Sequence, residues 1–139
     1  MKTMDLCGWR FFIADSINFK KEKVGKWMYF FRGEDGRNFT EAKCREAVET
    51  GIVQEAKCTN SMVEGVSCFY LNSDDTDGHK RVIKYLLDNR MIQKTKTGRY
   101  YNISFKLDEQ TRAGEYGDAY KSDIKLANFI DLNTGEWII

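Results

Sequence analysis

The sequence contains no proline, only one histidine and no long apolar run. Without proline, the chain can have neither a polyproline linker nor a native cis-prolyl bond. Without an apolar stretch of about 18 residues, it has no candidate transmembrane helix. The N-terminal residues Met1–Gly8 also lack the apolar core of a signal peptide. We therefore expect a cytoplasmic protein that does not contact the membrane.

An excess of charge of one sign is also lacking, because 22 basic and 21 acidic residues give a net charge of +1. Proteins dedicated to binding DNA or RNA usually carry a basic excess. The balance weighs against nucleic acid without excluding a local basic patch. The four cysteines, Cys7, Cys44, Cys58 and Cys68, show no Cys-x-x-Cys spacing and have one histidine beside them. We expect mostly buried, free thiols, and neither a metal site nor another cofactor.

The single histidine restricts the possible catalytic chemistry. A hydrolytic Ser–His–Asp or Cys–His site would have to use His79, which follows Gly78 at the expected start of a helix. There we expect an exposed first-turn residue. The chain has no Gly-x-Ser-x-Gly motif, P-loop or dinucleotide fingerprint. Paired carboxylates such as Asp108 and Glu109 lie in a polar loop, where acids are usually solvated. We predict that the protein is not an enzyme.

What the sequence does contain is an internal repeat with an offset of 39 residues. It aligns Phe30-Phe31 with Phe69-Tyr70, 45–50 with 84–89, and 52–54 with 91–93. A repeat of this length usually marks a repeated supersecondary unit. We predict one domain, residues 1–139, with a duplicated ββα core in residues 1–106. Residues 107–139 would form a C-terminal loop and extended segment.

Each copy of the repeat contains one helix. The apolar stripes are Cys44, Ala47 and Val48 in the first copy and Val82, Ile83, Leu86 and Leu87 in the second. Their spacing gives each helix one buried face. Asn38 or Thr40 could cap the first helix, and Gly51 lies where a C-cap glycine belongs. Residues 74–77 supply cap candidates for the second helix, and Asn89 could end it.

Six runs rich in aromatic and β-branched residues flank these helices. They cover residues 9–14, 26–31, 52–58, 66–71, 91–96 and 99–106, with a tight turn at Thr97-Gly98. The order ββ-α-ββ-α-ββ predicts an α+β fold: a six-stranded, mostly antiparallel sheet with both helices on one face. The opposite face would need cover from the C-terminal segment or from a partner chain.

The C-terminal segment differs in character from the core. Residues 124–132 and 137–139 could form short strands. The end, Trp137-Ile138-Ile139, is apolar, and we expect it to pack on the core or on a second subunit.

A basic, aromatic hairpin is the first candidate binding site. It carries Lys94, Lys96, Arg99, Tyr100 and Tyr101. Such a hairpin could contact phosphates and stack on bases. The alternative is a solvated hairpin face without a ligand.

The loop around Arg112 is the second candidate. Arg112, Tyr116 and the neighbouring glycines supply a guanidinium, an aromatic plane and flexible backbone N–H groups. These groups suit a phosphate and a base. Arg99 and Asn102, on the preceding strand, could add hydrogen bonds. An ordinary surface loop is again the alternative.

Six strands, two helices, the chain length and the late loop 110–114 with its arginine resemble the Tad1 (anti-Thoeris) family of phage proteins. Members bind cyclic ADP-ribose-type immune signals in pockets formed by an oligomer and do not cleave them. The resemblance implies a phage immune-evasion protein in the bacterial cytoplasm. It would be a homo-oligomer that sequesters a small anionic nucleotide, either a cyclic ADP-ribose isomer or a cyclic oligonucleotide. Arg112 would bind phosphates, and Tyr116, Tyr101 and Phe69 would hold the base.

Two other functions remain open from the sequence. A protein-binding inhibitor of a bacterial defence effector, of the anti-CRISPR type, would need an exposed aromatic or charged patch and no small ligand. A small nucleic-acid-binding module would use the hairpin 91–106 and would bind in a salt-sensitive manner.

Overall fold

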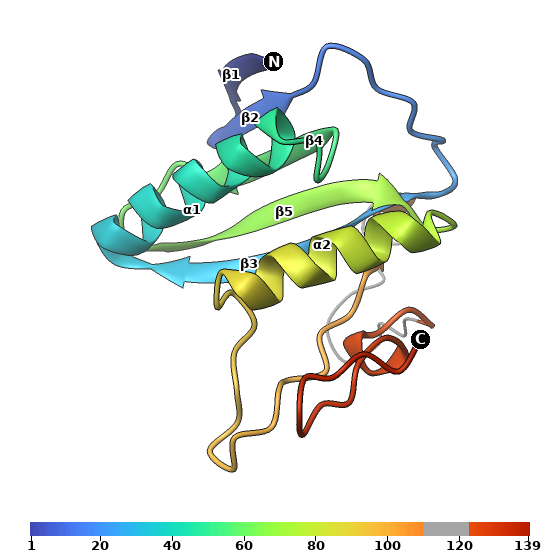
Figure 1. Cartoon of the computed structure of the whole chain (residues 1–139). Coiled ribbons are helices and arrows are strands. Elements are labelled where there is room, and N and C mark those ends of the chain that lie inside the picture. The colour runs from blue at the N-terminus through green and yellow to red at the C-terminus, as the bar shows by residue number, and fades with distance from the viewer. Residues whose placement is uncertain (110–122) are drawn as a thin grey trace.

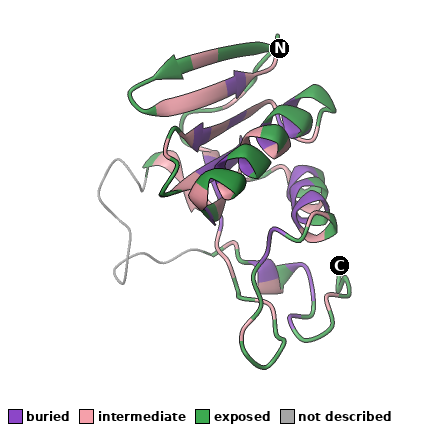
Figure 2. Ribbon diagram, turned by 90° about the vertical axis from the view of Figure 1, so that its left-hand side faces the viewer, coloured by how far each residue is buried: buried purple, intermediate pink, exposed green. Residues whose placement is uncertain are grey.

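A computed structural model describes residues 1–109 and 123–139. Its strands are β1 (Lys2–Leu6), β2 (Trp9–Ile13), β3 (Val24–Arg32), β4 (Glu55–Thr59), β5 (Glu64–Asn72) and β6 (Lys106–Leu107). They form one sheet in the order β1-β2-β4-β5-β3-β6, and all the pairs are antiparallel (Figure 1). Helices α1 (Gly33–Glu49) and α2 (Thr76–Asp88) lie on the same side of the sheet (Figure 2). The predicted α+β fold is confirmed.

The core lies between the sheet and the two helices. Both predicted apolar stripes are buried there, except that Leu87 is only partly buried. The sheet contributes the residues that alternate toward the helices, among them Phe12, Trp27, Ala56, Phe69 and Leu71. This arrangement follows from the period of two along a strand, which places every second side chain on one face.

The offset of 39 residues reappears at the ends of the two helices. Gly51 follows α1 with φ of 79°, and Arg90 follows α2 with φ of 56°. In each case the next N–H donates to a carbonyl of the last turn, Ala47 in α1 and Leu86 in α2, at 2.8 Å. Both helices therefore end in a Schellman motif, and the prediction for Gly51 is confirmed.

The helix starts differ from each other. The side chain of Asp75 caps α2 by accepting a hydrogen bond from the Gly78 N–H at 2.9 Å, as the acidic cluster predicts. Helix α1 begins at Gly33, so the prediction of Asn38 or Thr40 as its cap is wrong. The φ of 72° at Gly33 turns β3 directly into the helix, so no separate cap sequence is needed.

Several strand predictions need correction. Strand β1 was not predicted; it joins β2 through Cys7 and Gly8, whose φ values of 52° and 81° suit a two-residue hairpin turn. Strand β4 begins at Glu55 and not at Ile52, because the residues before it close the end of α1. Residues 91–96 and 99–105 form only a short turn with a single bridge, between Lys94 and Tyr100.

The C-terminal segment packs on the helix side of the sheet. Leu126, Phe129 and Ile130 are buried in the core cluster, and the Phe129 ring lies 6.4 Å from Trp27. On the other face of the sheet, Asp108 of the same segment accepts a hydrogen bond from the Lys26 ammonium at 2.8 Å. Residues 110–122 lie outside the described residues, so cover of the opposite face by this segment or by a partner chain stays a prediction. The end of the chain pairs through its backbone with the core residues Phe129 and Ile130, while the side chains of Trp137, Ile138 and Ile139 stay 40–57% exposed.

His79 is buried, so the prediction of an exposed residue is wrong. Its Nδ1 accepts a hydrogen bond from the Trp27 indole at 3.0 Å, and its Nε2 lies 2.9 Å from the Ser73 carbonyl. Accepting at Nδ1 requires a proton on Nε2, which then donates to Ser73. The ring also packs edge-on against Phe105, with 4.7 Å between ring centroids. His79 is a core residue that links α2 to β3.

We expect the stability of the fold to fall in mild acid because of His79. Burial lowers the pKa of His79, and the Ser73 carbonyl with Asp75 and Asp74 opposes this effect only in part. The unfolded chain therefore binds the proton first, since its histidine has a pKa of about 6.5. The contribution of His79 is fully present above that pH and is lost as the pH falls toward the folded-state pKa, by at most about 1.4 kcal/mol per pH unit.

Urea unfolding at a series of pH values between 7 and 5 measures this loss. The variant His79→Gln, which stays neutral throughout, should show a shallower dependence of the free energy of unfolding on pH. Equal slopes for the two proteins would contradict the role of His79.

Candidate binding groove beside strand β3

Among the residues that the structure describes, strand β3 has no neighbour along most of one edge, called here its free edge. On one side it pairs with β5 along all of Val24–Arg32. On the other side it pairs with β6 only at Gly25 and Lys26. Beyond Lys26, no described strand continues the sheet.

The bonding pattern shows which backbone groups face this edge. The N–H of Ser73 donates to the Lys23 carbonyl and that of Gly33 to the Val63 carbonyl, so the odd-numbered residues of β3 bond toward β5. The N–H and C=O groups of Met28 and Phe30 consequently point to the free edge. Within the described part of the chain, these groups form no hydrogen bond.

The edge is free because the segment predicted as a strand at residues 99–106 reaches β3 only at Lys106. The N–H of Phe105 donates to the Ile124 carbonyl at 2.9 Å, and the N–H of Leu126 donates to the Ile103 carbonyl at 2.9 Å. This segment thus pairs with the C-terminal region instead of continuing along β3. A gap opens between β3 and residues 101–103.

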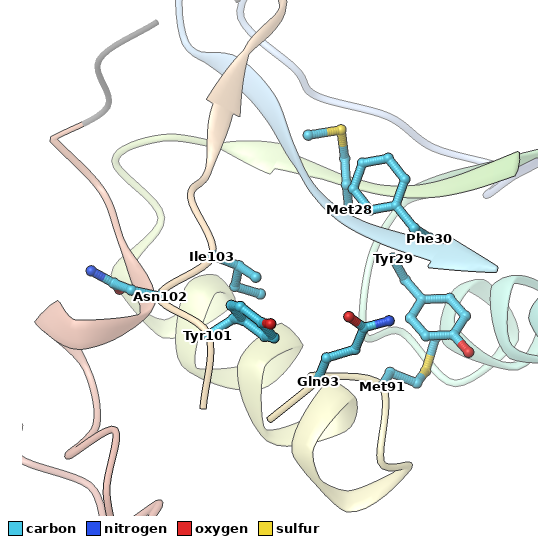
Figure 3. Close-up of a pocket in the computed structure, with 8 residues that line it drawn as sticks. All are labelled: Met28, Tyr29, Phe30, Met91, Gln93, Tyr101, Asn102 and Ile103. Carbon is cyan, nitrogen blue, oxygen red and sulfur yellow. The ribbon is translucent and has the colours of Figure 1, made fainter. Parts of the chain in front are cut away.

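The gap is a groove of about 310 Å³. Its lining residues carry no formal charge and are Met28, Tyr29, Phe30, Met91, Gln93, Tyr101, Asn102 and Ile103. Figure 3 shows Tyr29 directed toward the gap from β3, and Tyr101 and Ile103 from the facing segment. Gln93 lies beside Tyr101, whose N–H donates to the Gln93 carbonyl at 3.0 Å. Apolar walls with a few polar groups are typical of binding sites.

A second, wider hollow of about 730 Å³ continues the groove along the edge. The two share Tyr29, Phe30 and Gln93. Charges enter only in the second hollow, where Arg32 and Glu64 lie 3.9 Å apart on the surface. An exposed ion pair of this kind contributes little stability and is easily rearranged.

Exposed apolar side chains surround the groove. Phe30 is 64% exposed, and Tyr101 is half exposed on the other side. The tip of the β4–β5 hairpin adds Met62 and Val63, with Val63 77% exposed. The hydrogen bond from the Gly33 N–H to the Val63 carbonyl, at 2.7 Å, holds this tip against the end of β3. A group of exposed apolar residues beside a groove marks an interaction surface.

The structure brings together only part of the predicted site. Tyr101 and Asn102 line the groove. The Asn102 side chain points away from it, because its Oδ1 accepts a hydrogen bond from the Ala127 N–H at 2.8 Å, in the 3₁₀ turn η2 (Leu126–Asn128). Arg99 is exposed in the turn before the groove and does not line it.

Phe69 cannot hold a ligand, so its prediction as a binding residue is wrong. It has no exposed surface and packs in the core against Tyr85. Its aromatic character serves the packing of α2 on the sheet. Arg112 and Tyr116 lie outside the described residues, and their proposed roles stay predictions.

Sequence reasoning missed the β3 side of the groove. Met28 and Phe30 alternate with Trp27, Tyr29 and Phe31, which face the helices. The signal was present, because a strand with apolar residues at both parities has two apolar faces.

A cluster of charged side chains lies on β1, β2 and α1, near the other edge of the sheet, and was not predicted from the sequence. Arg10 donates to Asp5 at 2.8 Å and to Glu41, and the buried Arg37 lies 3.6 Å from Glu41. The hydrogen bond from Arg10 lowers the pKa of Asp5. Two arginines and two carboxylates neutralise one another, so this cluster offers little net attraction to an anion.

The described residues contain neither a group of metal-binding side chains nor a membrane-spanning helix. No group of three His, Cys, Asp or Glu side chains in residues 1–109 and 123–139 is placed to hold a metal ion. The helices in that part of the chain are too short or too polar to cross a membrane. Cys44, Cys58 and Cys68 are buried free thiols and Cys7 is an exposed one, which agrees with the prediction for most of them.

Comparison of the chain with known proteins does not indicate a function for the groove. A scan against protein-family models and a search among curated proteins both found no match to this chain. The resemblance to anti-Thoeris proteins therefore stays a prediction. The function has to be argued from the groove itself.

Proposed function

We propose that the protein acts by binding another protein at the groove beside β3. Among the functions that the sequence left open, this surface favours the inhibitor of a bacterial defence effector. The observation that carries the proposal is the free edge of β3 between Met28 and Arg32, bordered by the exposed Phe30. Proteins usually protect such edges with charges, proline or a covering segment, and an exposed apolar edge invites association.

The charge of the groove supports the same conclusion. None of the residues that line its narrow part is charged. Anionic ligands usually need a cation or a cluster of N–H donors within the site. Apolar and aromatic side chains with an amide suit the buried centre of a protein interface.

The nucleotide-type ligand of the sequence hypothesis is a second candidate, favoured by one observation. The rings of Tyr29 and Tyr101 and the amide of Gln93 line the same groove. Aromatic rings can stack on a base, and an amide can bond its edge. The sequestering protein of the sequence hypothesis would hold its base here and leave the phosphates to a cation outside the narrow part.

Thermal shift with cyclic ADP-ribose isomers and cyclic oligonucleotides separates the two candidates. A ligand bound only to the folded state adds about 2.7 kcal/mol of stability at a hundredfold excess over its dissociation constant. A large shift, with the ligand recovered intact, would favour the nucleotide. No shift across the panel would leave the protein-binding proposal as the better supported one.

Protein binding is tested by the variant Phe30→Glu. A partner isolated from bacterial extract would be purified and its affinity for the wild-type protein measured by calorimetry. We expect Phe30→Glu to weaken this complex at least about tenfold, because a charge would have to be buried in an apolar interface.

The matched control is Leu6→Glu, which introduces the same charge at an exposed apolar residue of β1, on the other edge of the sheet. It should leave the affinity unchanged. Both variants should keep the wild-type free energy of unfolding, since both side chains are exposed. A purified complex that tolerates Phe30→Glu would contradict the proposal.

A further inference from the structure

We infer that the partner binds as an extended strand, which adds to β3 at Met28–Arg32 and fills the gap between β3 and residues 100–104. This inference rests on the proposed function and deepens it by naming the chemical class of the partner segment. That segment is an uncharged, proline-free stretch with apolar residues at alternate positions. Its main recognition is by the backbone.

The backbone groups of β3 are already arranged for such a strand. Met28 and Phe30 each direct an N–H and a C=O to the free edge, and Arg32 directs its N–H there. Because β5 holds the other side of β3 along its full length, these groups are fixed in extended geometry before binding. A partner strand would complete a hydrogen-bonded ladder with little ordering of β3 itself, as in other cases of strand addition.

The opposite wall of the gap indicates a missing strand. The pairing of Lys26 with Lys106, if continued, would set Met28 against Ser104 and Phe30 against Asn102. The described sheet stops at β6, and the chain that should continue it turns toward Lys125. The groove therefore occupies the place where the next strand of the sheet would lie, about 4.8 Å from β3.

The side chains around the gap determine which positions of the partner strand must be apolar. Residues pointing to the face of the sheet opposite the helices would lie beside Met28 and Phe30. Residues of the other parity would enter the hollow beside Tyr29, Met91 and Ile103 (Figure 3). The inner environment favours an apolar side chain and excludes a charge, because its lining offers no counterion. An apolar residue is therefore needed at every second position of the partner.

The other edge of the sheet does not offer the same site. Strand β1 carries Lys2 and Asp5, both of them exposed. Charged side chains on an edge strand discourage pairing with another chain. The stretch Met28–Phe30 has no charge, so the two edges differ in the feature that decides association.

Amide hydrogen exchange with defined peptides tests the inference. The probes are acetylated and amidated heptapeptides in which Thr alternates with Val, Leu or Phe. In the free protein, the amides of Met28 and Phe30 should exchange about a hundredfold faster than those of Tyr29 and Phe31, which bond to β5. With saturating peptide, the exchange of Met28, Phe30 and Arg32 should slow at least about tenfold.

A matched peptide separates backbone recognition from simple apolar contact. The same heptapeptide with its three central amides N-methylated keeps its side chains but loses the donors, and we expect at least about tenfold weaker binding. Equal binding of the two peptides, or no protection of Met28 and Phe30 with any peptide of the panel, would overturn strand addition. If the free protein already protects these amides and Phe30→Glu halves its mass in solution, the edge pairs with a second copy and the inference is wrong.

The two proposals can fail separately. Suppose that the purified partner complex depends on Phe30, yet Met28 and Phe30 exchange rapidly within it. Strand addition is then wrong and the proposed function stands. A complex that does not depend on Phe30 removes the proposed function itself.

Discussion

The variant Trp27→Ala is expected to lose about 3–5 kcal/mol of the free energy of unfolding, the usual cost of removing a large buried aromatic side chain. Trp27 has no exposed surface and lies between β3 and three aromatic rings, those of His79, Phe105 and Phe129. Its truncation leaves a cavity and also removes the donor to His79 Nδ1. A loss of this size approaches the whole stability of many small domains.

Urea unfolding followed by circular dichroism measures this effect. Trp137→Ala is the matched control, because that indole is 40% exposed and should cost less than about 1 kcal/mol. The variant Trp27→Phe should fall between the two, since it keeps most of the volume but leaves Nδ1 of the buried His79 without its donor. Similar losses for Trp27→Ala and Trp137→Ala would contradict the position of Trp27 in the core.

The variant Gly25→Ala is expected to lose about 1–3 kcal/mol through overpacking. A Cβ at Gly25 would lie 2.6 Å from the Lys106 carbonyl oxygen and 2.6 Å from the Phe105 ring. Both neighbours lie at the start of β6, where it pairs with β3, so the extra methyl group would push the two strands apart. The groove begins at this junction, and strain there should also weaken binding at β3.

The matched control is Gly36→Ala, the same change within α1. A Cβ at Gly36 would meet the Phe31 Cβ at 3.5 Å, an ordinary contact. Alanine is favoured over glycine in a helix interior by about 1 kcal/mol, so this variant should be slightly more stable. Thermal unfolding of the two variants should therefore shift in opposite directions, and a loss of stability for both would contradict the prediction.

The proposed site explains why one side of β3 is left unpaired among the described strands. Pairing along β3 is complete toward β5 and stops after Lys26 on the other side. Phe105 packs in the core against Trp27 and His79, and residues 103–105 bond to residues 124–126 of the C-terminal segment. Residues 103–105 therefore do not pair with β3. The free edge is therefore a consequence of core packing, and a partner strand would restore the ladder without disturbing that packing.

The sequence by itself determined the framework of this protein. Alternating apolar residues and two helical stripes predicted the α+β sheet with helices on one face, since these periods depend only on local geometry. The left-handed turn at Gly51 and the cap of α2 at residues 74–77 also follow from local preferences. Each of these features uses interactions among residues close in the chain.

Only the tertiary structure decided where the site lies. Residues 99–105 satisfy a strand pattern, but a pattern does not choose the partner strand, and here the partner is residues 124–126 and not β3. In the same way, the side chains of His79 and Phe69 are of types found in catalytic or ligand-binding sites, yet the packing of α2 on the sheet buries both. The physical reason is that long-range pairing and burial depend on competition among distant segments, which no local pattern records.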